Sequence, residues 1–223
     1  MALPRSFTRA AGALLLAGSL ALSAGSATAL AADPPTTTDP GAAAAGWIAG
    51  QVEAGVGPGS LADAAAYIDA ALGEQTARRS LPFATVDRGR GRVVGSTRFL
   101  NIEYWTWPPG NAHQRGAERP DAVEIGATWL AADAQRTPIN TEAKLLMLEH
   151  AFDRWRVHRV SLMTDARNER SRNAIMRLGA RFDGVLRAAR PASDGNIRDT
   201  AAFSILESEW PAIRARLQAR LTQ

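Results

Sequence analysis

The 223-residue sequence contains no cysteine. This absence excludes a disulfide framework, a thiol nucleophile and a zinc–thiolate centre, and it is compatible with either redox compartment. Lysine is nearly absent too, because Lys144 is the only one and arginine supplies the other basic side chains. The planar guanidinium of arginine suits phosphate groups, but a general compositional bias towards arginine explains the same pattern. The net charge of +4 therefore leaves both interpretations open.

Several other functional classes lack their sequence signals. His113, His150 and His158 do not cluster with carboxylates at metal-ligand spacing, so we expect no metal. A Ser-His-Asp order and a nucleophile elbow are both missing. A single-strand nucleic-acid groove requires basic runs interleaved with aromatic residues, which the sequence does not have. Nucleic-acid binding is therefore only a weak hypothesis for this chain.

The first 32 residues have the three parts of a secretory signal. Arg5 and Arg9 give a charged start, residues 10–22 form an apolar stretch, and residues 27–31 contain two small-residue cleavage sites. The apolar stretch is too short for a stable membrane span, which needs about 20 residues. We interpret residues 1–32 as a signal-peptide-like leader, with a disordered amphiphilic leader as the alternative.

A linker rich in Pro, Thr, Ala and Gly follows over residues 33–60, and residues 61–223 have the length of one domain. A weak helix is expected inside the linker, at residues 47–52. Ser60 resembles a helix cap, and the apolar spacing after it predicts a helix over residues 61–72 that ends at Gly73.

The rest of the chain alternates between strand and helix patterns. Strands are expected over residues 81–86, 92–102, 122–130, 159–163 and 198–206. Three helices are expected: one begins at residue 141, a second ends near residue 178, and a third begins at residue 210. The main helix has an apolar stripe with helical spacing, made of Leu145, Leu148, Phe152 and Trp155. This alternation predicts an α/β fold.

A long irregular insertion is expected over residues 103–120, with Tyr104, Trp105 and Trp107 near its start. Loops of this length in compact domains are often functional. Two interpretations stand side by side: a lid over the substrate, or a surface loop that the two tryptophans anchor.

The most informative segment is 121–182, where strand 122–130 leads through the turn 135–140 into the main helix. The turn carries Arg136 and the helix begins near Thr141. A cationic turn at a helix start can hold a pyrophosphate, because backbone N–H groups and the helix dipole both favour anions there.

Three stretches of this segment resemble the GNAT N-acetyltransferase family, and within it the RimJ/RimL-like branch: the turn Gln135–Asn140, the string Asn140-Thr141-Glu142-Ala143-Lys144, and Ala166-Arg167-Asn168-Glu169-Arg170-Ser171. The resemblance covers about residues 66–223. In that family the turn reads Gln/Arg-x-x-Gly-x-Gly/Ala and cradles the pyrophosphate of acetyl-CoA. Here both glycine positions are changed, to Pro138 and Asn140, and a proline supplies no N–H.

The resemblance implies a GNAT-like mixed central sheet with helices on both faces, whose first strand is missing or replaced by the leader. It implies acetyl-CoA as co-substrate and direct transfer of the acetyl group to a primary amine of a protein N-terminus or a small molecule. It further implies that the cofactor-binding residues are Gln135, Arg136, Thr137, Ile139, Asn140, Thr141, Asn168 and Arg172. Asn168 would hold an amide of the pantetheine arm.

Acetyl transfer needs a neutral amine, a hydrogen-bond donor for the carbonyl oxygen, and a proton for the leaving thiolate. Glu124 lies early in the central strand, where this branch often carries a glutamate near the acceptor, and is expected to be the base through a water. Its alternative role is a solvent-facing strand carboxylate, and Asp121 and Glu103 are spare candidates. Ser171, three residues after Asn168, is the expected proton donor to the thiolate; Asn168 can equally be only a helix cap.

A second function stays open, namely an exported, non-catalytic protein that uses the GNAT scaffold for binding. Pro138 and the missing first strand favour it. The leader predicts export whereas acetyl-CoA chemistry predicts the cytoplasm, so the sequence leaves the location undecided. A homodimer is compatible with either function.

Overall fold

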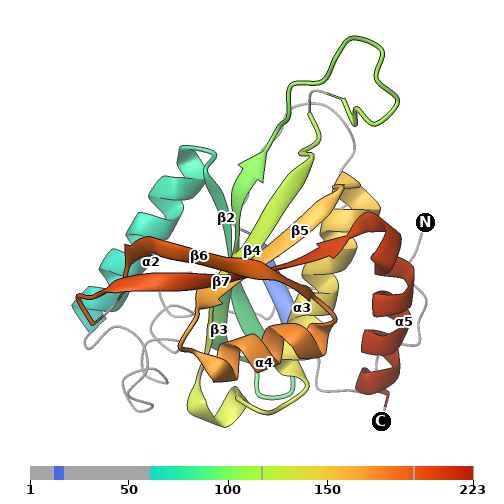
Figure 1. Ribbon diagram of the computed structural model, residues 1–223. Coiled ribbons are helices and arrows are strands. Elements are labelled where there is room, and N and C mark those ends of the chain that lie inside the picture. The colour runs from blue at the N-terminus through green and yellow to red at the C-terminus, as the bar shows by residue number, and fades with distance from the viewer. Residues whose placement is uncertain (1–12, 18–60, 117, 193, 223) are drawn as a thin grey trace. The chain divides into compact units, whose positions relative to one another are not determined.

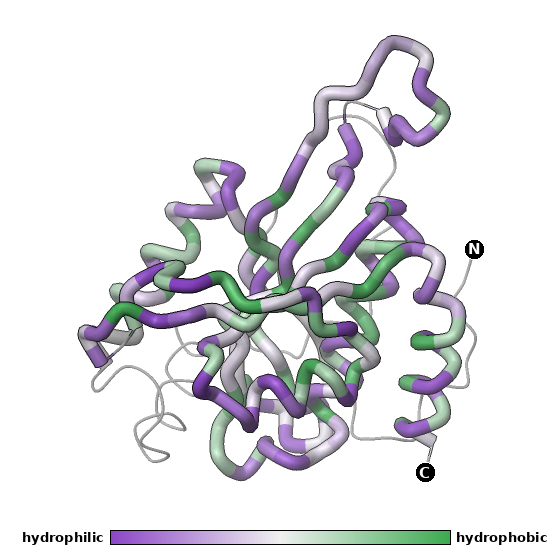
Figure 2. The backbone as a smooth tube through the Cα atoms, viewed as in Figure 1, coloured by the Kyte–Doolittle hydropathy of each residue, from purple (hydrophilic) through white to green (hydrophobic). Residues whose placement is uncertain are grey.

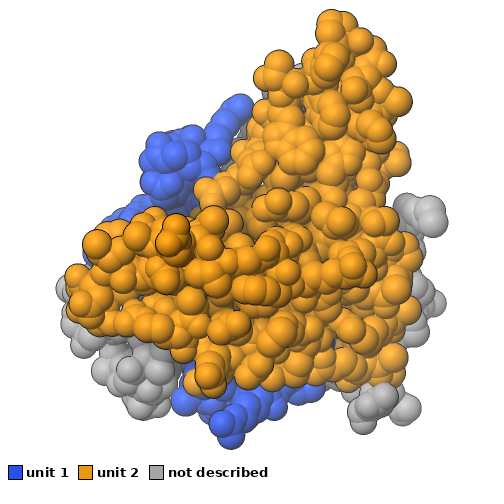
Figure 3. Space-filling view, in the orientation of Figure 1, with its two compact units in different colours: residues 1–97, 128–143 blue, residues 98–127, 144–223 orange. Residues whose placement is uncertain are grey.

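The computed structural model describes residues 13–17, 61–116, 118–192 and 194–222. The expected linker helix at residues 47–52, and all of the leader except residues 13–17, lie outside the described residues. The chain divides into two compact units that alternate along the sequence (Figure 3). Unit 1 comprises Met1–Thr97 and Thr128–Ala143, and unit 2 comprises Arg98–Ala127 and Lys144–Gln223.

Unit 1 contains helix α2 (Leu61–Thr76), strands β1 (Ala13–Ala17) and β2 (Ser80–Asp87), and the first half of β3 (Arg92–Glu103). The turn between β2 and β3 forms at the predicted place, and its Gly91 has a left-handed φ of 63°. Helix α2 does not end at Gly73 as expected, because it continues through the glycine to Thr76. Gly73 therefore costs helix stability without serving as a cap.

The edge strand of unit 1 comes from an unexpected part of the chain. Strand β1 pairs antiparallel with β2, with Ala13 opposite Asp87 and Ala17 opposite Phe83. These residues belong to the stretch interpreted as the apolar part of the leader. The position of a first strand, which the sequence left empty, is thus filled by Ala13–Ala17.

Unit 2 contains the parallel pair β4 (Ala122–Leu130, ending in unit 1) and β5 (Arg159–Asp165). Strands β6 (Arg181–Pro191) and β7 (Ile197–Leu206) continue the pattern antiparallel, and the strand order is β1-β2-β3-β4-β5-β7-β6. The helices are α3 (Ile139–Glu149), which begins in unit 1 and runs into a π-helical turn (His150–Trp155), then α4 (Glu169–Leu178) and α5 (Trp210–Leu221) (Figure 1).

The apolar stripe predicted for the main helix is largely confirmed. Leu145, Leu148 and Phe152 are buried, and Phe152 stacks on Trp210 at the start of α5 with 5.4 Å between ring centroids. Hydrophobic residues recur along α5 (Figure 2), and its Ile213 and Leu217 are buried. Burial of such stripes holds a helix in place more strongly than its intrinsic propensity does.

The predicted α/β fold with a mixed sheet is confirmed. Strand β6, like β1, is an element that the sequence interpretation missed, and nearly all residues of β6 are exposed. A strand without a buried face carries no alternating apolar signal.

Candidate active site

The predicted base, Glu124, lies in β4 and is only 3% exposed. It stands opposite Ser161 in the parallel pairing with β5. Its Oε2 accepts a hydrogen bond from Nδ2 of Asn101 in β3, over 2.7 Å. Because Glu124 is buried, its interpretation as a solvent-facing carboxylate is wrong. A buried carboxylate that accepts a hydrogen bond is a candidate for proton transfer.

The turn predicted to hold the phosphates is fixed by hydrogen bonds from two of its own side chains to backbone carbonyls. Nε2 of Gln135 donates to the Leu130 carbonyl over 2.9 Å, and Oγ1 of Thr137 donates to the Ala134 carbonyl over 2.7 Å. The left-handed residue of the turn is the exposed Arg136, with φ 62°. These contacts fix the turn and leave the guanidinium of Arg136 exposed.

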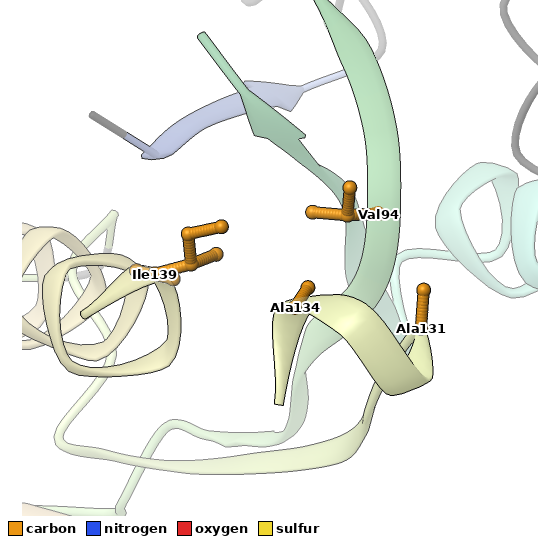
Figure 4. Packing of buried hydrophobic residues seen from close by; sticks show 5 residues of the cluster. Val94, Ala131, Ala134 and Ile139 are labelled. Atoms are coloured by element: carbon orange, nitrogen blue, oxygen red, sulfur yellow. The ribbon is translucent and has the colours of Figure 1, made fainter. Parts of the chain in front are cut away.

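Helix α3 begins at Ile139, two residues earlier than expected. The Ile139 side chain is 3% exposed and packs in a cluster with Val94, Ala131, Ala134 and Ala143 (Figure 4). A ligand at the turn therefore has only the backbone of Ile139 within reach. Asn140 and Thr141 are partly exposed in the first turn of the helix.

A pocket of about 340 Å³ lies beside this turn in unit 1. It is lined by the β2–β3 turn on one side and the phosphate turn on the other: Asp87, Gly89, Arg90, Asp133, Thr137, Pro138 and Ile139. Arg90 pairs with Asp133 over 2.8 Å, and Arg92 pairs with the same carboxylate. The arginines beside the turn are thus neutralised by carboxylates, so the pocket is no simple anion site.

The other predicted residues lie at the start of α4 in unit 2. Asn168 is the N-cap, and its Oδ1 accepts a hydrogen bond from the Ser171 backbone N–H over 2.9 Å. The cap role is confirmed, and a ligand contact through the Asn168 Nδ2 is compatible with it. The hydroxyl of Ser171 is partly exposed on the same helical turn.

Arg172 is held more tightly than a surface arginine. Its Nη1 donates to the Ala166 carbonyl over 3.2 Å, and its guanidinium carbon lies 5.7 Å from the centre of the Phe182 ring. Its Nε is buried and has no hydrogen-bond partner. In the loop before α4, Arg167 forms an ion pair with Asp165. Hydrogen bonds from Arg167 lower the pKa of Asp165 to about 2.

The insertion after β3 is anchored at its base by Asp121. This buried carboxylate accepts hydrogen bonds from the Trp105 backbone N–H over 2.8 Å and from the Trp107 indole over 2.7 Å. Trp105 also stacks on the His158 ring with 5.7 Å between centroids, and its indole donates to Glu103. Both spare candidates for the base, Asp121 and Glu103, are therefore occupied as anchors of the loop.

The tautomer of His158 follows from its partners. Its Nε2 lies 2.9 Å from the His113 carbonyl, which can only accept, and its Nδ1 lies 3.2 Å from Nη2 of Arg115, which can only donate. These two contacts suit the tautomer that carries its proton on Nε2. His113 and His158 thus help to hold the insertion after β3, which is a structural role.

The predicted site residues fall into both units. Gln135, Arg136, Thr137, Ile139, Asn140 and Thr141 belong to unit 1, whereas Glu124, Asn168, Ser171 and Arg172 belong to unit 2. The sequence did not point to Asn101. Its contact with Glu124 joins two residues 23 positions apart on neighbouring strands, and such a contact leaves no local sequence pattern. The sequence also gave no role to Lys144, which is 4% exposed and whose pKa is lowered to about 7 by burial.

Neither a metal nor a membrane feature is found within the described part of the chain. No group of three or more His, Asp or Glu side chains there is arranged to hold a metal ion. None of the helices described has the length and hydropathy that a membrane span requires.

The sequence matches the acetyltransferase (GNAT) domain over residues 30–181. The chain belongs to the GNAT acetyltransferase family. A GCN5-related N-acetyltransferase from Brucella melitensis is 32% identical, with a TM-score of 0.61 over 74% of this chain and 66% of that one. A protein of T. thermophilus described as an acetyltransferase is 34% identical, with a TM-score of 0.59 over 73% of this chain and 76% of that one.

The fold alone is shared with RimJ of Mycobacterium smegmatis, solved with CoA-disulfide. It is 22% identical, with a TM-score of 0.62 over 79% of this chain and 84% of that one. A comparison with curated protein sequences finds no match. Membership of the family supports acetyl transfer as the general activity of this GNAT chain.

Proposed function

We propose that this GNAT chain is an N-acetyltransferase that moves the acetyl group of acetyl-CoA directly to a primary amine. The observation that carries the proposal is Glu124, a buried carboxylate on the strand β4 that leads into the turn and helix α3. A carboxylate in this place can take the proton that a primary amine must lose during attack.

The reaction needs no covalent enzyme intermediate. The neutral amine attacks the thioester carbonyl and a C–N bond forms, while Glu124 accepts the amine proton through a water. The tetrahedral intermediate then breaks its C–S bond and releases the CoA thiolate, which takes a proton from Ser171. Water restores both side chains afterwards, so the sum is amine plus acetyl-CoA giving amide plus CoA.

Acetyl-CoA is assigned to the turn and the start of α4. The pyrophosphate is proposed to contact Gln135, Arg136, Thr137 and the backbone and side chains of the first helical residues, Ile139, Asn140 and Thr141. The exposed guanidinium of Arg136 supports this assignment. Asn168 is assigned to a pantetheine amide, and Arg172 to a phosphate through the guanidinium N–H groups not used on Ala166. RimJ of Mycobacterium smegmatis binds a CoA derivative on the same fold.

The acceptor class is proposed at the level of a primary amine, either a protein N-terminus or a small molecule. The RimJ/RimL-like branch is part of this proposal and rests on the Asn140–Lys144 and Ala166–Ser171 strings. The exported, non-catalytic alternative is not favoured by the family membership. A homodimer is compatible with the proposal.

The leader is a separate proposal. The charged start, apolar stretch and Ala-x-Ala sites support export and cleavage between Ala29 and Asp33. The pairing of Ala13–Ala17 with β2 weighs against removal of this segment, because cleavage would take the edge strand away.

Two measurements test the enzymatic proposal on the full chain. Acetyl-CoA is expected to raise the melting temperature, because a ligand that binds only the folded state stabilises it by mass action. No shift at millimolar acetyl-CoA would overturn the proposal. Glu124→Gln is expected to lower kcat about 10²–10⁴-fold with little change in acetyl-CoA affinity.

The other assigned residues give distinct phenotypes in the same kinetic panel. Ser171→Ala should change the alkaline limb of the pH profile, and Asn168→Ala should chiefly weaken acetyl-CoA binding. Retention of full activity by Glu124→Gln across the pH range would place the base elsewhere.

A further inference from the structure

We propose that Asn101 is the positioning residue for the Glu124 carboxylate, holding one of its oxygens so that the other faces the reacting amine or its water. This inference rests on the proposed function and assigns a residue to the same site. Asn101 lies in β3, next to β4 in the strand order.

The first observation is the hydrogen bond itself. Nδ2 of Asn101 donates to Oε2 of Glu124 over 2.7 Å. Glu124 is buried whereas Asn101 is exposed, so an exposed residue supplies the donor to a buried carboxylate. Hydrogen bonds to charged groups are about twice as strong as neutral ones, so such a donor holds the carboxylate in one orientation.

The second observation is the backbone of Asn101. Its φ is 45°, inside a strand where extended residues have φ near −140°. A left-handed residue in a strand costs free energy and persists only where the surroundings demand it. Asparagine tolerates this conformation better than most residues, and it is also the side chain that supplies the donor.

The third observation is the close packing of Gly126 beside the other carboxylate oxygen. A Cβ built on Gly126 would lie 3.0 Å from Oε1 of Glu124 and 2.8 Å from Cδ1 of Leu100. Oε1 of Glu124 and Leu100 therefore pack closely against Gly126, and any larger residue at this position would push them aside. The carboxylate thus has an amide on Oε2 and a glycine beside Oε1.

Together these contacts give the two carboxylate oxygens of Glu124 different roles. Oε2 stays bonded to Asn101, and Oε1 is the atom that receives the amine proton through water. Loss of the amide donor makes the carboxylate easier to protonate and lets it rotate away from the acceptor. Both effects reduce the fraction of productive base.

The test uses two substitutions in the full chain that separate the amide from the backbone. Asn101→Gly removes the amide and relieves the left-handed φ, since glycine adopts it without strain. Asn101→Asp keeps the size but replaces the donor with a second carboxylate. We expect kcat to fall about 10-fold in both, the size of one charged hydrogen bond, with the acetyl-CoA KM unchanged.

The acidic limb of the pH profile is expected to move to higher pH in both variants, and further in Asn101→Asp because like charges favour the protonated acid. In a Glu124→Gln background, neither substitution should lower kcat again, since the two residues act as one unit. Asn173→Asp, an exposed asparagine of α4, is the control and should change none of these values.

A purely structural role gives a different result. It would lower stability in Asn101→Asp and Asn101→Ala, leave the acidic limb in place, and add to the loss caused by Glu124→Gln. Either an unmoved acidic limb or additive losses would overturn the proposal.

A second readout works without turnover and separates this proposal from the proposed function. The carboxyl ¹³C signal of Glu124, assigned by its loss in Glu124→Gln, is followed against pH by NMR. We expect its midpoint to rise in Asn101→Gly and Asn101→Asp. An unchanged midpoint overturns the role of Asn101 even in an active enzyme, whereas a shifted midpoint in a chain that transfers no acetyl group overturns only the proposed function.

Discussion

Lys144 illustrates how one buried side chain contributes to the pH dependence of stability. It is 4% exposed, and burial lowers its pKa from 10.5 to about 7. The folded value lies below the unfolded one, so the unfolded chain binds more protons between about pH 7 and pH 10.5. The free energy of unfolding contributed by this group therefore rises with pH through that window and is lowest below pH 7.

We predict that Lys144→Met removes this rise and stabilises the chain at neutral pH by about 1–3 kcal/mol, because no charge then has to be desolvated. Urea unfolding at pH 7 and pH 10 measures both quantities. Lys144→Arg is the matched control: its guanidinium stays charged, so it should lower stability at both pH values. A slope between pH 7 and pH 10 that survives in Lys144→Met would contradict the assignment.

At the residue scale, the sequence singled out Glu124 through the family resemblance and the Asn168 cap through its position at a helix start. It did not predict the burial of Glu124 or its bond to Asn101, because both depend on which strands are neighbours. It gave no sign either that Arg136 would be the left-handed residue of the turn. Local propensity is a weak guide where anchoring contacts such as that of Gln135 decide the backbone.

At the scale of elements, periodic segments were predictable and exposed ones were not. The stripe Leu145, Leu148 and Phe152 located the main helix because a buried face imposes helical spacing. Strand β6 went unnoticed since its pairing with β7 is held by backbone hydrogen bonds and not by a buried face. The irregular insertion was recognised from composition, but its anchor on Asp121 was not.

The anchoring of the insertion gives a prediction for that element. Asp121→Asn keeps one acceptor but turns a donor towards Trp105 or Trp107, so one of the two bonds is lost. We expect a loss of about 1–3 kcal/mol in stability, the cost of a broken buried charged hydrogen bond. Amide exchange of residues 104–116 should become faster, which mass spectrometry resolves.

Glu103→Gln is the control for this element. Glu103 also accepts a bond from Trp105, but both partners are exposed, so its stability should change by less than about 0.5 kcal/mol. Equal effects of the two substitutions would show that the buried carboxylate is not the anchor. Acetyl transfer that survives in Asp121→Asn would in addition favour the anchored surface loop over a lid.

At the scale of the molecule, the chain passes three times between its two units. The turn at residues 135–140 belongs to unit 1 and Glu124, Asn168 and Ser171 to unit 2, while α3 and strands β3 and β4 run through both. The proposed reaction draws on residues of both units. A substitution that disturbs either unit should therefore reduce acetyl transfer, even where the residues of the other unit remain folded.

The last prediction concerns the first residues of the molecule, where two expectations conflict. The sequence predicts removal of the leader between Ala29 and Asp33, whereas the structure pairs Ala13–Ala17 with Phe83–Asp87 as the edge of the sheet. We expect a chain that begins at Asp33 to melt at a lower temperature than the full chain. It should also associate more readily, because β2 then presents unpaired N–H and C=O groups at an open edge. Thermal unfolding with light scattering of both chains, and the N-terminal mass of the native protein, provide the measurements. Equal melting temperatures and a native chain that starts after Ala29 would show that Ala13–Ala17 contributes nothing to the fold. A native chain that retains Met1, with a destabilised truncation, would make this segment a strand of the acetyltransferase and not a signal.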